Sequence, residues 1–594
     1  MKVLDRDLDL YLVEGVRDLN EVERFVSGQD VISFDIEVLP PPRNMNAFVD
    51  SDSDVVGFSF SNGVRSYFCF VNDESLGFLR WLCEEEKPVK VLHNWIFDSS
   101  FLFLRKGIRL WRFEDTYLMA RMIYMDGVSL GLKDLCRDVL HLDSERFKVD
   151  FRNVGCSDDL AVYGAYDAWL TYKLYEHLKP ILEKKGWVDL YTKLREVEVV
   201  LLEIFLSGIK VDLQDLAKLR IELSENIGDM RRAIYVRVGK EFNLNSTKEL
   251  GNILFKELGL KPVKFTRKLG APAVDEEVLR ELSAESEVAR MILEYRRLEK
   301  LRSTFVERLE EWLVDGRIHA VFNFDTKSLR VASRSPNMQN IPRDSVIRRV
   351  FKAEDGMRFI MCDFNQAELR MIAEVSRDRN LMNIFREGQD LHSIVAKEIF
   401  GLDCPVEEVK EKYGEFRSKA KGVNFGIAYG VTAKGLAGLL GITKVEADRI
   451  IQRWYSLFRG VRSLSDRVRQ KLIEEGRIEN FFGLERRVEN FEDLLRLDPV
   501  GAQALLREIF NWIIQSSTAI LAHLGLLSAY RWLKENRFLD YCYPVLHLHD
   551  GFIFECEEPY VEKIAGSLAG LMCSAVRTVI PFTVEVSVGE RWAS

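Results

Sequence analysis

The stretch that decides the fold is MRFIMCDFNQAELR, residues 357–370. Its first half is an apolar run that ends at Asp363, and its second half, with Glu368 and Arg370, changes to a pattern that begins a helix. We therefore predict a strand that carries Asp363 at its end, where α/β folds place catalytic groups. For this segment taken alone, an N-capped helix with ordinary charges is the default explanation.

A second acidic turn lies near the end of the chain. VLHLHDGFIFEC (545–556) holds His549 and Asp550 between two apolar runs, and PFTVEVSV (581–588) is another run of period two. These runs predict a β-hairpin or neighbouring strands. A polar hairpin tip would explain His549 and Asp550 by themselves. Beside Asp363 their meaning changes, because two-metal phosphoryl transfer needs about two anionic side chains that bridge both ions.

The segment RSKAKGVNFGIAYG (417–430) carries four functional candidates spaced by four: Arg417, Lys421, Phe425 and Tyr429. On a helix this spacing leaves one stripe, with two cations near the positive amino-terminal end. A polyanion alongside would explain the arrangement, with a triphosphate against the cations and a base and sugar against the rings. A solvated basic turn followed by an aromatic core face is the alternative.

Three polar pairs lie in the first 190 residues, which alternate strand-like runs with amphipathic segments. They are Asp35 with Glu37, Asn94 with Asp98, and Tyr163 with Asp167. The first pair shares one face of a strand, and the last shares one face of a helix. A strand end turning to solvent, a helix cap and aromatic packing would explain the pairs one at a time. Two carboxylates on one face of an apolar strand repel each other unless a cation compensates them.

The composition sets limits on the class of protein. A chain of 594 residues exceeds one hydrophobic core, so we expect three or more domains; 47% hydrophobic and 30% charged residues are typical of globular proteins. The opening MKVLDRDLDLYL is too charged for a signal peptide, and we see no uninterrupted apolar stretch long enough to span a bilayer. Nine scattered cysteines without a CxxC pair disfavour a disulfide framework or a structural zinc site and indicate a reducing cytoplasm.

The net charge of −9 looks wrong for a nucleic-acid binder, but an average hides local patches. Residues 326–352 contain seven basic side chains and a single acid, Asp344. The basic residues are Lys327, Arg330, Arg334, Arg343, Arg348, Arg349 and Lys352. We therefore expect a basic surface in this part of the chain.

Taken together, the ordered motifs resemble those of family-A DNA polymerases of the DNA polymerase I large-fragment type. The family's DYSQIELR, RxxxKxxxFGxxYG, VHDE and PNLQNIP resemble DFNQAELR, residues 417–430, LHDG and PNMQNIP of this chain. LSGIKVD (206–212), FNLNSTKEL (242–250) and LEYRRLEKLRSTF (293–305) are similar to its thumb and neighbouring segments. The order DxE, NxxxD, YxxxD over roughly residues 1–185 resembles the DEDDy group of 3′–5′ exonucleases.

The resemblance implies a fold of mixed α/β and α+β domains, a ribonuclease H-like exonuclease followed by a right-hand polymerase with an antiparallel palm sheet and helical thumb and fingers. The implied domains are 1–190, the exonuclease; 191–310, thumb and connecting palm; 311–370, palm with the first metal aspartate; 371–500, fingers; and 501–594, palm with the second. We expect no 5′ nuclease domain upstream. The implied partners are primer-template DNA and deoxynucleoside triphosphates, with no membrane. The implied protein is a monomer in the cytoplasm of a bacterium or of a virus-infected host.

The resemblance also implies a role for each matching residue, with two Mg²⁺ or Mn²⁺ ions at each active site. The polymerase metal ligands would be Asp363, Asp550 and the carbonyl of Phe364, and the exonuclease ligands Asp35, Glu37, Asp98 and Asp167. The nucleotide site would comprise Arg417, Lys421, Phe425, Tyr429, Glu368 and Gln366, and the DNA contacts Arg330, Arg507, Asn511, Gln515 and His549. Lys421 would also protonate the leaving pyrophosphate, Tyr163 would orient the attacking water, Glu368 would exclude a ribose 2′-hydroxyl, and Phe425 predicts poor dideoxynucleotide use.

Several positions depart from the family pattern. Gly551 replaces a glutamate, Ala367 a bulkier aliphatic residue, SLRVAS the family's TGRLSS, and QSSTAI its QGTAAD. Three other classes of protein are alternatives: a nuclease with a DNA-binding scaffold, a single-subunit RNA polymerase, and a non-enzymatic nucleic-acid-binding module. The presence of Asp363, Asp550 and Lys421 argues against the first. Glu368 and the amino-terminal exonuclease argue against the second, and the carboxylates remain unexplained by the third.

Overall fold

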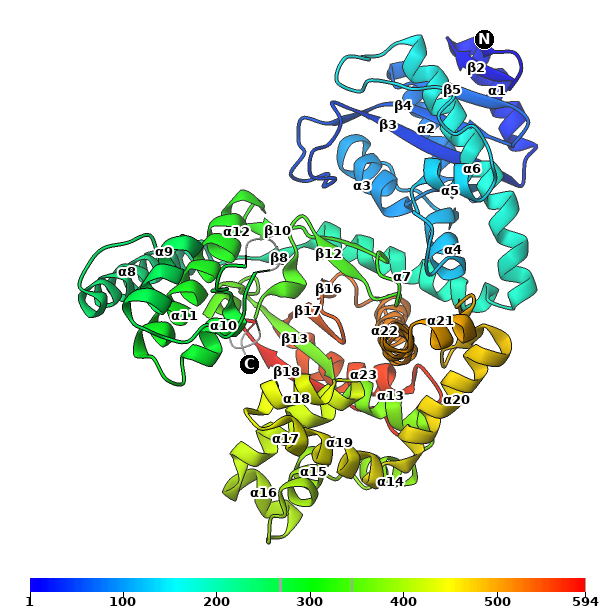
Figure 1. Ribbon diagram of the computed structural model, residues 1–594. Coiled ribbons are helices and arrows are strands. Elements are labelled where there is room, and N and C mark those ends of the chain that lie inside the picture. The colour runs from blue at the N-terminus through cyan, green and yellow to red at the C-terminus, as the bar shows by residue number, and fades with distance from the viewer. Residues whose placement is uncertain (267–269, 343–345, 593–594) are drawn as a thin grey trace. The chain divides into compact units, whose positions relative to one another are not determined.

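The computed structural model describes residues 1–266, 270–342 and 346–592. The chain divides into two compact units, each considered by itself (Figure 1). The larger unit comprises Met1–Ser207, Ala320–Ser335 and Gly356–Val588, and the smaller unit Gly208–His319, Pro336–Asp355 and the residues from Gly589. The predicted basic stretch is shared between the two units, and its residues Arg343 and Asp344 lie outside the described residues.

The amino-terminal part of the larger unit is a seven-stranded mixed sheet in the order β1-β2-β5-β4-β3-β6-β7. The strands are β1 (Lys2–Asp5), β2 (Leu10–Val13), β3 (Val31–Leu39), β4 (Asp54–Ser61), β5 (Ser66–Phe70), β6 (Val89–Leu92) and β7 (Phe113–Asp115). The helices are α1 (Val16–Ser27), α2 (Asp73–Glu84), α3 (Trp95–Lys106), α4 (Thr116–Ile123), α5 (Leu132–Asp138) and α6 (Asp158–Lys185). The central strand β3 runs antiparallel to β4 and parallel to β6, and α6 packs against β3, β4 and β5.

A four-stranded sheet in the order β16-β17-β13-β18 forms the second centre of the larger unit. Its strands are β13 (Met357–Phe364), β16 (Cys542–His547), β17 (Gly551–Glu557) and β18 (Val584–Gly589). The predicted strand before Asp363 and the predicted hairpin around Asp550 are therefore confirmed. The expectation that residues 581–588 lie next to that hairpin is wrong, because β13 lies between β17 and β18. Period-two alternation identifies a strand but carries no information about its neighbours.

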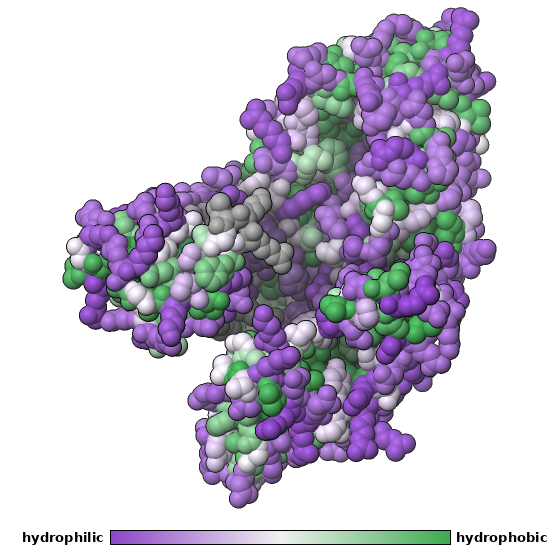
Figure 2. Space-filling view, in the orientation of Figure 1, coloured by the Kyte–Doolittle hydropathy of each residue, from purple (hydrophilic) through white to green (hydrophobic). Residues whose placement is uncertain are grey.

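The helix α22 (Pro499–Glu535) packs against α7 (Val188–Ser207), α13 (Ala367–Ser376), α21 (Phe491–Leu497) and α23 (Val561–Ser574). By length and composition alone it could cross a membrane, although polar residues such as Asn511 and Gln515 interrupt its apolar run. However, 89% of its apolar window is buried inside the protein, which is typical of the core helix of a soluble domain. On the face seen in Figure 2, hydrophobic residues occur in scattered groups among hydrophilic ones.

The residues that follow Glu368 form a block of many short helices. They are α13, α14 (Arg379–Arg386), α15 (Leu391–Phe400), α16 (Val406–Lys412), α17 (Gly414–Ala428), α18 (Ala433–Leu440), α19 (Lys444–Leu457) and α20 (Arg459–Glu475). Buried polar contacts fix α17 in this group: Asn424 bonds to the His392 ring at 2.9 Å and accepts from Trp454 Nε1 at 2.8 Å. The short pairs β11 (Val321–Asn323) with β12 (Ala332–Arg334), and β14 (Arg477–Glu479) with β15 (Glu485–Arg487), complete the unit.

The smaller unit is mainly helical. Its helices are α8 (Leu213–Val238), α9 (Thr247–Gly251), α10 (Glu276–Leu282), α11 (Glu287–Lys300) and α12 (Glu307–Glu311), with wider helical turns at Asn252–Glu257 and Leu301–Val306 and a short 3-10 turn at Val346–Val350. The helices α8 and α11 pack together, and a small sheet joins β8 (Ile209–Lys210), β10 (Arg317–Ile318) and β9 (Leu313–Val314). Asp212 caps α8 and binds Arg591, which ties the carboxyl-terminal segment to this unit.

Candidate active sites

Four carboxylates of the amino-terminal sheet domain lie close enough to act on one another. Asp35 and Glu37 stand on β3, Asp98 on α3 and Asp167 on α6. Burial, followed by the charge of Asp167, raises the pKa of Asp35 to about 8, and burial with the charge of Asp35 raises the pKa of Glu37 and of Asp98. The structure therefore brings together the four residues that the sequence motifs single out.

The close approach of α6 to β3 depends on a glycine. A Cβ atom on Gly164 would lie 2.7 Å from the Phe68 ring and 3.1 Å from Glu37 Oε1, so a larger residue would push the helix away from the strand. Tyr163 precedes this glycine and presents its ring to the same cluster. Burial and the nearby Asp167 and Glu37 raise the pKa of Tyr163, so its hydroxyl keeps its proton.

The residues of this cluster fit a divalent cation chemically. Glu37 is only 5% exposed, and its Oε1 has no hydrogen-bond partner within the described ranges, a costly state for a buried anion. Carboxylate oxygens are the ligands that Mg²⁺ and Mn²⁺ prefer. As they stand, however, no three His, Cys, Asp or Glu side chains in the described parts of the chain are positioned to hold a metal ion.

The sequence analysis missed one residue of this cluster, Lys133 on α5. Its ammonium group forms an ion pair with Asp167 and lies 4.4 Å from the centre of the Tyr163 ring. Its charge opposes the rise in the pKa of Asp35, Glu37 and Asp167. No spacing signal could have found it, because Lys133 lies 34 residues before Asp167 in an ordinary amphipathic segment.

The strands β13 and β17 place the second pair of aspartates at adjacent strand ends. Asp363 is paired with Gly551 across β13 and β17, and Phe364 N donates to the carbonyl oxygen of Asp550 at 3.0 Å. Both aspartates are partly exposed, and the neighbouring His549 is exposed. A Cβ atom on Gly551 would lie 2.6 Å from Asp363 Oδ1. Gly551, at the position where the family has a glutamate, thus leaves the space that the Asp363 carboxylate occupies.

A buried glutamate joins three further candidates next to this turn. Glu368 is 9% exposed at the start of α13 and accepts hydrogen bonds from both Arg330 and the Tyr429 hydroxyl. Gln366 precedes the helix with a left-handed φ of 50°, and its Oε1 is buried without a partner among the described residues. The structure thus connects side chains for which the resemblance implies separate roles in nucleotide and DNA binding.

The stripe on α17 forms as predicted. The rings of Phe425 and Tyr429 lie 6.5 Å apart and nearly parallel, at 19°, and Lys421 is exposed. Arg417 Nε donates to Asp390 Oδ2 at 2.6 Å. Asp390, which also caps α15, is not among the residues predicted from the sequence. Its position before LHSIVAKEIF indicates a helix cap but gives no indication of an arginine partner.

The α22 face with Arg507, Asn511 and Gln515 lies against the end of the α17 segment. Asn511 Nδ2 donates to the carbonyl oxygen of Tyr429 at 3.1 Å, and the Arg507 side chain packs on Gly430, where a Cβ would meet it at 2.9 Å. The segment before β12 is held on the same helix, since Trp512 Nε1 donates to the carbonyl oxygen of residue 327 at 3.0 Å. These contacts place Arg330, Glu368, Tyr429 and Asn511 in one continuous region.

Two protein families match the chain. The DNA polymerase family A model matches residues 213–594, and a 3′–5′ exonuclease model matches residues 12–183. Similar curated proteins include DNA polymerase I of Chloroflexus aurantiacus, 34% identical over 85% of this chain and 54% of that protein. DNA polymerase I of Pseudomonas aeruginosa is 31% identical over 88% of this chain and 58% of that protein. The chain spans about half the length of the curated relatives it matches.

A solved structure of the POL domain of Pol1 from M. smegmatis, in complex with DNA primer-template and dNTP, has the same fold. Its TM-score is 0.86 at 25% identity, and the match covers 98% of this chain and 99% of that one. The predicted fold class, an exonuclease domain followed by a right-hand polymerase, is therefore confirmed. The family match extends over well more than half of the sequence and includes both palm aspartates. The chain belongs to DNA polymerase family A and carries a 3′–5′ exonuclease domain.

Proposed function

We propose that this protein synthesises DNA on a template from deoxynucleoside triphosphates and removes mispaired 3′ ends with its amino-terminal domain. The observation that carries the proposal is the pairing of β13 with β17, which sets Asp363 beside the turn of Asp550. Two divalent ions at each site, Mg²⁺ or Mn²⁺, would supply the Lewis acidity that phosphoryl transfer needs. Asp363, Asp550 and the carbonyl of Phe364 would hold the polymerase pair.

The α17 stripe supports a triphosphate site beside those aspartates. Lys421 is exposed, and its ammonium group donates to the phosphates and protonates the leaving pyrophosphate. Arg417 exchanges Asp390 for a phosphate, because a guanidinium binds either anion with the same geometry. The Phe425 ring lies along the sugar, so the side chain offers no hydroxyl to replace a missing 3′-hydroxyl, and dideoxynucleotides are poor substrates.

The Glu368 network supports sugar selection and DNA positioning. Held by Arg330 and Tyr429, the Glu368 carboxylate blocks a ribose 2′-hydroxyl, with Gln366 lining the same site. The remaining polar side chains of this region contact the primer-template near its terminus. They are Arg330, Arg507, Asn511, Gln515 and His549.

In the exonuclease domain, Asp35, Glu37, Asp98 and Asp167 would hold the second pair of ions. The Tyr163 hydroxyl keeps its proton, so it orients the attacking water by donating or accepting a hydrogen bond. Lys133 balances part of the negative charge until the ions bind. In this proposal the protein is a monomer in a cytoplasmic compartment. Residues 371–500 are the fingers, which close on a paired nucleotide.

Primer extension on a defined template with Mg²⁺, with and without deoxynucleotides, tests both activities. Asp363→Ala should abolish extension and leave primer degradation intact, whereas Asp35→Ala should abolish degradation and leave extension intact. Asp52→Ala, which removes an exposed carboxylate of the same domain as Asp35, serves as the control and should change neither. Extension that survives in the Asp363 variant would refute the synthetic half of the proposal.

A further inference from the structure

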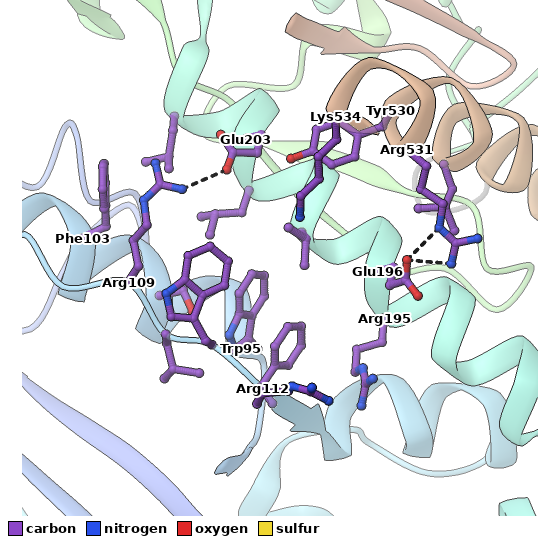
Figure 3. A pocket seen from close by; sticks show the side chains of 18 residues that line it. Trp95, Phe103, Arg109, Arg112, Arg195, Glu196, Glu203, Tyr530, Arg531 and Lys534 are labelled. Carbon is purple, nitrogen blue, oxygen red and sulfur yellow. Dashed lines mark hydrogen bonds and ion pairs between the residues drawn. The ribbon is translucent and has the colours of Figure 1, made fainter. Parts of the chain in front are cut away.

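A cavity of about 400 Å³ lies in the larger unit, and neither acidic cluster lines it. Its walls come from α3, the segment that leads into β7, α7, and the carboxyl-terminal half of α22 (Figure 3). This volume is within the range of sites that bind small molecules. The cavity is therefore large enough for a ligand of several rings or groups.

The walls offer flat aromatic surface. Trp95 packs on Phe113 with ring centres 3.9 Å apart and an interplanar angle of 4°, and this buried pair backs the wall of the cavity. Trp111 also lines the cavity and is 46% exposed, an unusual state for so large a ring. Tyr530 of α22 lies on the other side of the cavity from Trp95 in Figure 3. A planar ring is the group that such surfaces bind best.

The lining carries an excess of positive charge. Its carboxylates, Glu203 and Glu196, are both paired, with Arg109 at 3.4 Å and with Arg531 at 2.6 Å. Two further cations of the lining are paired outside it, Arg112 with Glu86 at 3.5 Å and Arg195 with Glu114 at 2.6 Å, which leaves Lys534. Figure 3 shows the Lys534 side chain directed into the cavity, and no ion pair joins Lys534 to any other described residue. An anionic group would therefore bind here with favourable charge complementarity.

We propose that this cavity binds a small aromatic anion of the nucleoside monophosphate class. The base packs against the exposed Trp111 ring, and the phosphate faces Lys534. The choice of a nucleotide rests on the proposed function, because trimming of a DNA 3′ end releases nucleoside monophosphates. Binding at this cavity requires neither catalysis nor a metal ion.

Calorimetric titration of the full chain with 2′-deoxyadenosine 5′-monophosphate tests the proposal. The titration is done in EDTA on the Asp35→Ala background, which removes binding at the acidic cluster. Trp111→Ala and Lys534→Ala should each weaken binding about tenfold or more, the size expected for a lost stacking or phosphate contact. The exposed Lys444→Ala on α19 is the matched control and should bind as the background does.

Two further probes separate the parts of the ligand. Deoxyadenosine and inorganic phosphate should each bind at least about tenfold more weakly than the nucleotide, because each lacks one of the two contacts. Absence of nucleotide binding, or binding that Trp111→Ala and Lys534→Ala leave unchanged, overturns the proposal. Equal affinity for phenyl phosphate overturns the assignment to nucleotides. None of these results depends on nuclease activity, so failure here leaves the proposed function standing.

Discussion

The two acidic sites differ in how the fold treats their carboxylates. In the exonuclease domain, β3, α3 and α6 bury four of them, and burial raises the pKa of each. In the palm, Asp363 and Asp550 stand partly exposed at adjacent strand ends. A buried cluster of like charges depends on a cation for its stability, whereas an exposed pair is stabilised by water in the absence of substrate. The folded exonuclease domain should therefore be more sensitive to metal removal than the palm.

The largest expected effect is a separation of the two activities. Asp550→Asn should lower primer extension at least about a hundredfold, because even the loss of a group that only supports a metal ligand costs up to that much. Asp98→Asn should lower primer degradation by a similar factor. Rates from single-turnover assays of each activity on both variants measure the effect.

Each variant is also the control for the other. Asp98→Asn should leave extension within about twofold of the wild type, and Asp550→Asn should do the same for degradation, since the sites share no ligand. A parallel loss of both activities in either variant would mean that the two carboxylate sites act as one unit. The comparison between a buried and an exposed site would then fail.

The second effect concerns sugar selection at the palm. Glu368→Ala should raise ribonucleotide incorporation relative to deoxyribonucleotide incorporation by roughly tenfold or more, because the variant removes the group that excludes the 2′-hydroxyl. Relative kcat/KM values for the two nucleotides measure this change. Glu387→Ala, an exposed glutamate beyond α14, is the matched control. Unchanged exclusion of ribonucleotides in Glu368→Ala would refute the assigned role.

The sequence predicts the strand ends and the helix stripe well, because each depends on local pattern. The run before Asp363 and the four-residue spacing from Arg417 to Tyr429 fix which side chains share a face. The bond between Tyr429 and Glu368 is different, since it joins residues 61 apart through packing of α13 and α17. A sequence pattern gives no information about contacts between residues so far apart in the chain. The roles of Glu368 and Tyr429 are therefore predicted only from the family resemblance.

The same limit explains what the sequence analysis missed. Lys133 and Asp390 join the candidate sites only because α5 and α15 place them against Asp167 and Arg417. The length and composition of α22 are ambiguous for a related reason. A helix that is buried on all sides carries the same apolar residues as one that faces lipid, and only the packing of its neighbours distinguishes the two.

The third effect is on metal affinity. Lys133→Met should raise the affinity of the exonuclease cluster for Mn²⁺ about tenfold, because the variant removes a cation that already pairs with Asp167. Calorimetric titration with Mn²⁺ on the Asp550→Asn background isolates this site. Lys148→Met, which removes an exposed lysine of the same domain, is the control. Weaker Mn²⁺ binding in Lys133→Met would show that the lysine supports the metal-bound arrangement instead.

The smallest effect is a pH dependence of stability without metal. A carboxyl group whose pKa is raised in the folded protein binds its proton more tightly than in the unfolded chain, where the pKa is about 4. The folded state is therefore destabilised as the pH rises from about 4 through the raised pKa, which is about 8 for Asp35. In EDTA, calorimetry should show the exonuclease domain losing at least about 1 kcal/mol between pH 5 and 8, and Mg²⁺ should remove most of this loss. Asp98→Asn should flatten the dependence, because it deletes one of the buried charges, whereas Asp550→Asn should leave it unchanged. A slope that persists in full in Asp98→Asn would place the titrating groups outside the buried cluster.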